Sequence, residues 1–237
     1  MTKKRRTVDN PKPKFSFKKN VFPPLMGLLV MLSIFGLFNS EYLVAQYVYR
    51  FAKPQLASAQ SYTYTPNKDV SQIMIPTLGI TAPIVSEPSF VESDVQGGLK
   101  RGVVHFGTLG EFGKFGNVVI VGHSSGAAWS PGQYKFVFTM LDKIQTNDKI
   151  IIDYKGTRYI YSVKSINVVE PTNVEVLKQP KDKKMITLIT CTPVGTSAKR
   201  LIVTGEQIVP KTEPNELTAP ADTDSLSVPP SRIVLPN

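Results

Sequence analysis

Short apolar runs separated by turn residues dominate the chain from Ser71 to about Val209. The runs are rich in Val, Ile, Thr and Tyr, and Gly, Pro, Asn and Asp stand between them, which is typical of β-strands joined by tight loops. The pattern predicts strands at Gln72–Ile75, Ile80–Val85, Asn117–Gly122, Lys149–Tyr154, Arg158–Val169, Met185–Cys191 and Leu201–Ile208. Many short strands with few helices predict an all-β domain that closes, or nearly closes, into a barrel.

One segment of this domain departs from the strand pattern. Between Tyr134 and Ile144 the large apolar residues, among them Phe138 and Leu141, do not alternate with polar residues as they would in a strand. Their spacing predicts a short helix over residues 134–144. Asn147-Asp148, a pair that favours turns, then leads into the next strand.

A separate apolar stretch stands near the N-terminus. No charged residue occurs from Val21 to Ser40, and Leu25 to Phe38 is almost wholly apolar. About 20 apolar residues cross a bilayer as a helix, and Pro23-Pro24 suits a first helical turn. The chain is therefore divided into a basic cytoplasmic segment (1–20), a transmembrane anchor helix (21–50), a stalk (51–70), the β domain (71–209) and a disordered Pro-rich tail (210–237).

The net charge of +10 is concentrated ahead of the apolar stretch. Residues 1–20 contain eight Lys and Arg residues against Asp9 alone, so the remainder of the chain holds only +3. Because a basic segment beside a span stays in the cytoplasm, we expect a single-pass cell-membrane protein with its N terminus inside and its β domain outside the cell. The small residues of Ala57-Ser58-Ala59 would suit a cleaved secretory signal, but they lie about twenty residues beyond the apolar core. Without a basic face on the folded part, nucleic acid is not a predicted partner.

The chain contains a single cysteine, and its position suggests chemistry. Cys191 ends an apolar run that begins at Met185, and loop residues follow it. Arg200 stands at the start of the next predicted strand, and His123 follows the strand Asn117–Gly122. A lone cysteine is usually a small buried hydrophobe, but a place at a strand end beside a turn favours a reactive role.

Acyl transfer by a thiol requires three groups. The thiol must be available as thiolate, a proton donor must serve the departing amine, and positive charge or N–H donors must face the developing oxyanion. Cys191, His123 and Arg200 can meet these needs in that order, and arginine stays charged at any working pH. The sequence predicts a cysteine transpeptidase with these three catalytic residues and no cofactor.

At these residues the sequence resembles the sortase family. Thr187-Leu188-Ile189-Thr190-Cys191 matches the TLxTC signature of sortases, and the arginine and the histidine stand where that family has them. The resemblance covers residues 71–208 and implies an eight-stranded sortase β-barrel with short helices. It also implies that Thr190 helps to stabilise the reaction intermediate, although a β-branched residue in a strand needs no such role.

The resemblance also implies the substrates. Sortases cleave an LPxTG-like sorting signal through a thioacyl intermediate and transfer the product to an amine. The implied partners are surface proteins that bear sorting signals, an amine acceptor from a peptidoglycan precursor or a pilin lysine, and the membrane. The continuation Thr192-Pro193-x-Gly195 resembles the pilin-polymerising branch, whose usual second span does not follow in this sequence, so the subclass stays open.

Two other functions remain as alternatives. An exported cysteine peptidase, papain-like or of the cell wall, places its cysteine before its histidine, whereas both histidines here precede Cys191. A non-catalytic membrane-anchored binding module would not need the cysteine, histidine and arginine together.

Several other residues carry weaker expectations. His105 is expected to be a hydrogen-bonded structural histidine, and Arg158 a solvated surface residue. Trp129 is expected either to line a substrate groove or to pack against the domain. Glu170 and Glu175 are two separated carboxylates, too few for calcium, which prefers six to eight oxygen ligands, so no metal site is predicted.

Overall fold

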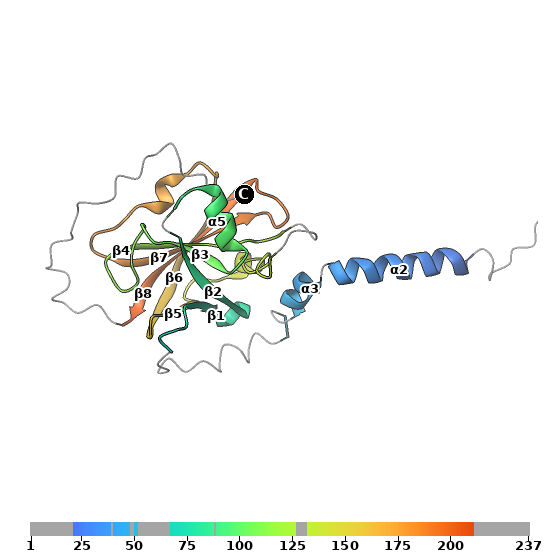
Figure 1. Ribbon diagram of the computed structural model, residues 1–237, viewed down its shortest axis with the longest axis horizontal. Helices are drawn as coiled ribbons and strands as arrows, with labels where there is room; N and C mark the ends of the chain where they lie inside the picture. The colour runs from blue at the N-terminus through green and yellow to red at the C-terminus, as the bar shows by residue number, and fades with distance from the viewer. Residues whose placement is uncertain are drawn as a thin grey trace, which may run out of the picture. The chain divides into compact units, whose positions relative to one another are not determined.

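The protein is described by a computed structural model over residues 21–38, 40–47, 50–51, 67–87, 89–126 and 132–210. The chain divides into two compact units, Met1–Ser40 and Glu41–Asn237. In the second unit eight strands close into a barrel in the order β1-β2-β3-β4-β7-β8-β6-β5 (Figure 1). The predicted eight-stranded all-β barrel is confirmed, and closure leaves no sheet edge unpaired.

The strands are β1 (Gln72–Ile75), β2 (Ile80–Glu87), β3 (Val103–Phe106), β4 (Gly116–Val121), β5 (Lys149–Tyr154), β6 (Thr157–Val169), β7 (Lys184–Thr192) and β8 (Lys199–Val209). The described helices are α2 (Phe22–Phe38), α3 (Ser40–Tyr47) and α5 (Glu92–Leu99), with short 3-10 helices η2 (Pro76–Leu78), η3 (Leu141–Lys143) and η4 (Val174–Leu177). Neighbouring strands are antiparallel, except that β2 pairs with β3 and β4 with β7 in parallel.

Every second strand residue fills the barrel interior. Val118 and Ile120 of β4 belong to this core, together with Ile186 and Leu188 of β7. The period of two arises because successive side chains of a strand point to opposite faces of the sheet. The intervening residues of these strands are therefore directed outward.

A second apolar cluster covers the outer face of the same strands. It contains Val121 of β4 and Ile189 of β7, with Val95 of α5 and Leu177 of η4. Because Cys191 continues the outward series of Ile189, its side chain belongs to this outer face. Two covering elements, α5 and η4, thus contribute to the face on which the candidate nucleophile lies.

The seven strands predicted from the apolar pattern are all present, with ends that differ by at most a few residues. The sequence pattern missed β3, because it has four residues that are all buried and therefore shows no alternation.

The helix expected over residues 134–144 is wrong. Residues 135–140 form turns, and only η3 (Leu141–Lys143) is helical in this segment. Phe138 and Leu141 are core residues, so their spacing reflects packing rather than a helical period.

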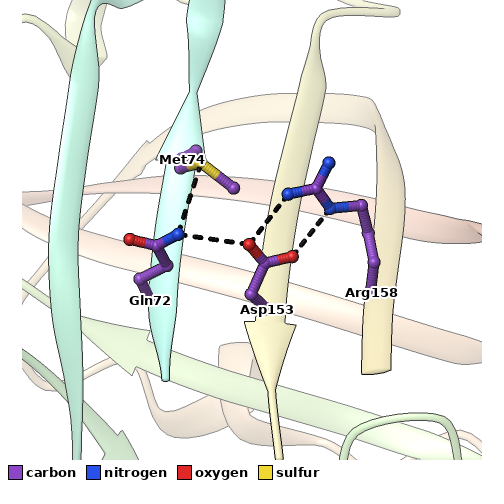
Figure 2. Close-up of polar contacts among 4 residues, drawn as sticks. All are labelled: Gln72, Met74, Asp153 and Arg158. Carbon is purple, nitrogen blue, oxygen red and sulfur yellow. Dashed lines mark hydrogen bonds and ion pairs between the residues drawn. The ribbon is translucent and has the colours of Figure 1, made fainter. Parts of the chain in front are cut away.

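A buried ion pair joins β5 and β6. Arg158 Nε lies 2.7 Å from Asp153 Oδ1, and its Nη2 donates to Oδ2 at 2.8 Å. Gln72 Nε2 donates to the same Oδ2 at 3.1 Å (Figure 2). The expectation of a solvated Arg158 is wrong, because its guanidinium neutralises a carboxylate that is fully buried and does so through two parallel hydrogen bonds.

The first unit contains α2, whose 17 residues include none that is buried. Within the part of the chain that the structure describes, no helix combines the length and the apolar character needed to cross a membrane. The predicted basic segment 1–20, most of the stalk and all of the tail beyond residue 210 lie outside the described residues.

Candidate active site

The parallel pairing of β4 with β7 brings two candidate catalytic residues to the same end of the barrel. Val121 pairs with Ile189, and the N–H of Gly122 donates to the carbonyl of Ile189 at 3.1 Å. If this register is extended by two residues, His123 lies opposite Cys191. The two side chains then share the outer face, because each stands two residues after an outward-facing strand residue.

The hairpin of β7 and β8 places the third candidate. Cys191 and Arg200 are direct cross-strand partners in this antiparallel ladder, where facing Cβ atoms lie about 4.5–5.5 Å apart. Arg200 is only 1% exposed, and its Nη1 donates to the carbonyls of Ser197 and Lys199 at 2.9 and 3.2 Å. The loop residue Ser197 and the first residue of β8 therefore hold the guanidinium in place on the strand that faces Cys191.

A cleft of about 420 Å³ opens at these residues. Cys191 and His123 both line it, with residues 124–126 on one side and residues 195–197 on the other. Ser125 Oγ accepts a hydrogen bond from the N–H of Gly195 at 3.0 Å and so joins the two loops. Arg200 is not part of the lining, but its positive charge lowers the pKa of the Cys191 thiol.

Burial controls the protonation of the thiol and the imidazole. Desolvation raises the pKa of Cys191 above its ordinary value, an effect that the positive charge of Arg200 opposes and the negative charge of Glu92 increases. Desolvation also lowers the pKa of His123, and Glu92 opposes this change. At neutral pH both groups are therefore mostly neutral.

Thr190 has a structural partner in this site. Its Oγ1 donates to the carbonyl of Gly122 at 2.7 Å, and its side chain is buried. The N–H of Phe138 donates to the next carbonyl, that of His123, at 2.9 Å. The backbone that carries His123 is therefore held from two sides, and Thr190 acts on it through Gly122.

Glu92 was missed by the sequence reasoning. It is the first residue of α5, and its charge acts on both His123 and Cys191. An acidic residue in a first helical turn is common because it favours the helix dipole, so nothing in the sequence distinguished this one.

The other described candidates, His105, Glu170 and Glu175, do not line the cleft. His105 is buried, and its Nε2 lies 3.2 Å from the carbonyl oxygen of Gly110, in keeping with a structural role. Glu170 pairs with Lys199, and Glu175 with Lys178. Within the described ranges no three His, Cys, Asp or Glu side chains form a group suited to a metal ion. Trp129 lies outside the described residues.

Comparison with known proteins relates the chain to one family. A sequence profile of the sortase domain matches residues 73–208. Sortase SrtE1 of Streptomyces coelicolor is 29% identical over 160 residues, which cover 62% of this chain and 42% of that protein. Sortase A of Bacillus anthracis is 25% identical over 156 residues, which cover 66% of this chain and 68% of that protein. The matched region is thus less than half the length of the Streptomyces relative.

Solved structures show the same fold. Sortase A from Corynebacterium diphtheriae, in a lid mutant, superposes with a TM-score of 0.50 and 28% identity over 69% of this chain and 80% of that one. Sortase C1 of Streptococcus agalactiae, in complex with MTSET, gives a TM-score of 0.50 and 25% identity over 75% of this chain and 92% of that one.

Proposed function

This chain belongs to the sortase family of cysteine transpeptidases, and we propose that it cleaves an LPxTG-like sorting signal and transfers the product to an amine. One observation carries the proposal: Cys191 and His123 line the same cleft, with Arg200 directly across the strand ladder from the thiol. This arrangement supports thiol-based acyl transfer because nucleophile, proton donor and fixed positive charge lie together.

In the first half-reaction the thiolate of Cys191 attacks the scissile carbonyl carbon, and a C–S bond forms. The oxyanion that develops is stabilised by the nearby charge of Arg200. The C–N bond then breaks while the imidazolium of His123 gives its proton to the departing amine. A thioester on Cys191 and a neutral imidazole remain.

In the second half-reaction a neutral amine attacks the thioester. A C–N bond forms, the C–S bond breaks, and Cys191 leaves as thiolate. His123 accepts one proton from the attacking nitrogen, which restores the thiolate–imidazolium pair. The amine is proposed to come from a peptidoglycan precursor or a pilin lysine, and the sorting signal from another surface protein.

We further propose that the N-terminal segment anchors the enzyme in the cell membrane, with its N terminus in the cytoplasm and the catalytic domain outside. The basic residues before Val21 support this orientation, and α2 is apolar with no buried side chain. N-terminal sequencing of protein extracted from membranes tests the anchor. A mature start at Gln60 would instead indicate a cleaved signal.

Incubation of the protein with a library of sorting peptides and a primary amine tests the activity. Mass spectrometry should find the N-terminal part of one peptide joined to the amine, and a folded Cys191→Ala variant should form neither thioester nor product. Hydrolysis of the peptide at a rate that does not depend on the amine concentration, with no amine-linked product, would indicate a cysteine peptidase. Peptide binding without any turnover would indicate a binding module.

A further inference from the structure

Helix α5 lies beside β2 and β3 and covers part of the outer face (Figure 1). Val95 and Leu99 of this helix belong to the same cluster as Val121 and Ile189, which stand two residues before His123 and Cys191. Glu92 precedes Val95 by three residues and so lies on the same side of the helix. The helix therefore carries a carboxylate into the neighbourhood of the candidate thiol and imidazole.

The two oxygens of this carboxylate differ. Oε1 accepts a hydrogen bond from Gln96 Nε2 at 2.6 Å, one turn along the helix. Oε2 is buried and has no hydrogen-bond partner within the described part of the chain. A buried carboxylate oxygen without a donor is costly, and one that is kept near a catalytic site suggests that a donor is supplied during the reaction.

We propose that Glu92 is a positioning residue that completes a Cys191, His123 and Glu92 arrangement by stabilising the protonated ring of His123. The inference rests on the proposed transpeptidase function. The imidazolium N–H is the donor that Oε2 lacks, and the negative charge of Glu92 favours the charged ring. While the C–N bond of the sorting signal breaks, Glu92 holds the ring as it passes its proton to the departing nitrogen.

Among the charged groups near His123, Glu92 is the one suited to stabilise the imidazolium. Its negative charge raises the pKa of His123, whereas burial lowers it. Arg200 faces the thiol and lowers its pKa. Lys135 packs its aliphatic chain against Gly126, in the loop that follows His123. Among the described residues, the Glu92 carboxylate is thus the negative charge that acts on the His123 imidazolium.

The same charge opposes the thiolate, since Glu92 raises the pKa of Cys191. Removal of the charge should therefore have two opposite effects. The thiol becomes more acidic and reacts faster with a small electrophile, while peptide cleavage becomes slower because the imidazolium is less stable. A purely structural role would not produce this combination.

The test compares Glu92→Gln with Asp94→Asn in the 237-residue chain. Asp94 is exposed in the same helical turn, so its variant removes an equal charge that faces solvent. In Glu92→Gln, an NMR titration should show His123 ionising at lower pH, and iodoacetamide should alkylate Cys191 faster at neutral pH. Cleavage of the preferred peptide should fall by about tenfold or more, whereas Asp94→Asn should match the wild type in all three measurements.

Glu92→Asp, which keeps the charge, should retain part of the cleavage and serves if Glu92→Gln does not fold. The proposal is overturned if His123 titrates identically in Glu92→Gln and wild type, or if cleavage is unchanged. It is also overturned if cleavage persists and only transfer to the amine falls, because Glu92 would then bind the acceptor. The titration and the alkylation need no substrate, so they test Glu92 even if the wild type cleaves no sorting peptide.

Discussion

At the scale of single residues, the protonation of Cys191 and His123 governs the chemistry. Burial raises the pKa of the thiol and lowers that of the imidazole. The neutral thiol–imidazole pair therefore predominates, and the reactive thiolate–imidazolium form is a minor fraction of the enzyme. The two forms hold the same number of protons, so their ratio does not depend on pH. That fraction is lost when the imidazole of the neutral pair gains a proton at low pH or its thiol loses one at high pH.

We therefore expect kcat/KM for peptide cleavage to follow a bell-shaped pH profile. The acid limb should lie below 6.5, the ordinary value of histidine, and the alkaline limb above 9.0, that of the thiol. Steady-state cleavage over the pH range in which circular dichroism shows a folded protein measures both limbs. An acid limb above 6.5 or an alkaline limb below 9.0 would contradict the effect of burial.

Arg200→Lys should be a damaging substitution although it keeps the charge. Nη1 of Arg200 donates to the carbonyls of both Ser197 and Lys199. The flexible, strongly hydrated ammonium of lysine does not reproduce the position of this planar group, so its charge would not stay beside the thiol. Loss of one oxyanion-stabilising group costs about 10²–10³ in rate, and we expect a fall of that order in kcat/KM. Arg101→Lys, at an exposed ion pair with Glu87, is the matched control. A wild-type rate for Arg200→Lys would mean that any nearby cation suffices.

The sequence was informative about this site where chemistry restricts residue choice. The chain has one cysteine and only two histidines, so few candidates existed for the nucleophile and the proton donor. The structure brings Cys191 and His123 together in one cleft and places Arg200 across from Cys191. Glu92 could not be selected, because its importance depends on the packing of Val95 over the sheet. The partner of Thr190 is equally a matter of tertiary contact, since Gly122 is 68 residues away.

At the scale of elements, prediction succeeded where one face of a strand differs from the other or where the apolar run is long. It failed for β3, which is short and buried on both faces. It also failed for α5, an eight-residue helix that contains Gly97 and Gly98, both unfavourable in helices. Gly98 packs so closely on Val104 that a Cβ would lie 2.6 Å from its side chain, so tertiary packing selects glycine there against helix propensity.

The link between β4 and β7 gives a test at this scale. Thr190→Val keeps the shape but removes the donor to the carbonyl of Gly122, so the segment that carries His123 should loosen. We expect faster amide hydrogen exchange at residues 122–124 and a kcat/KM reduced by about tenfold or more, because small displacements of catalytic groups are costly. Thr190→Ser keeps the hydroxyl and should behave much more like the wild type. Reduced activity with unchanged exchange would favour direct stabilisation of the intermediate by Thr190.

At the scale of the whole molecule, closure of the barrel assembles the site from distant segments. His123 follows β4, whereas Cys191 and Arg200 lie on β7 and β8, and the register of two ladders brings them together. The end of β6 borders the site, because Val169 pairs with Arg200. The opposite arc of the barrel, formed by β1, β5 and the beginning of β6, contributes none of these residues. This arc should affect the site through the stability of the fold alone.

The ion pair of Asp153 and Arg158 tests this separation. Arg158→Ala leaves a fully buried carboxylate with Gln72 as its remaining side-chain donor, and breaking a buried pair costs about 3–5 kcal/mol. We expect denaturant unfolding to show a loss of this size in the free energy of unfolding, with nearly wild-type kcat/KM wherever the variant is folded.

The double variant Asp153→Leu/Arg158→Met removes both charges and should be more stable than Arg158→Ala, because no charge stays buried without a partner. A double variant as unstable as Arg158→Ala would show that packing of the guanidinium, rather than charge neutralisation, stabilises this arc. A large loss of kcat/KM in folded Arg158→Ala would show that the two sides of the barrel are coupled.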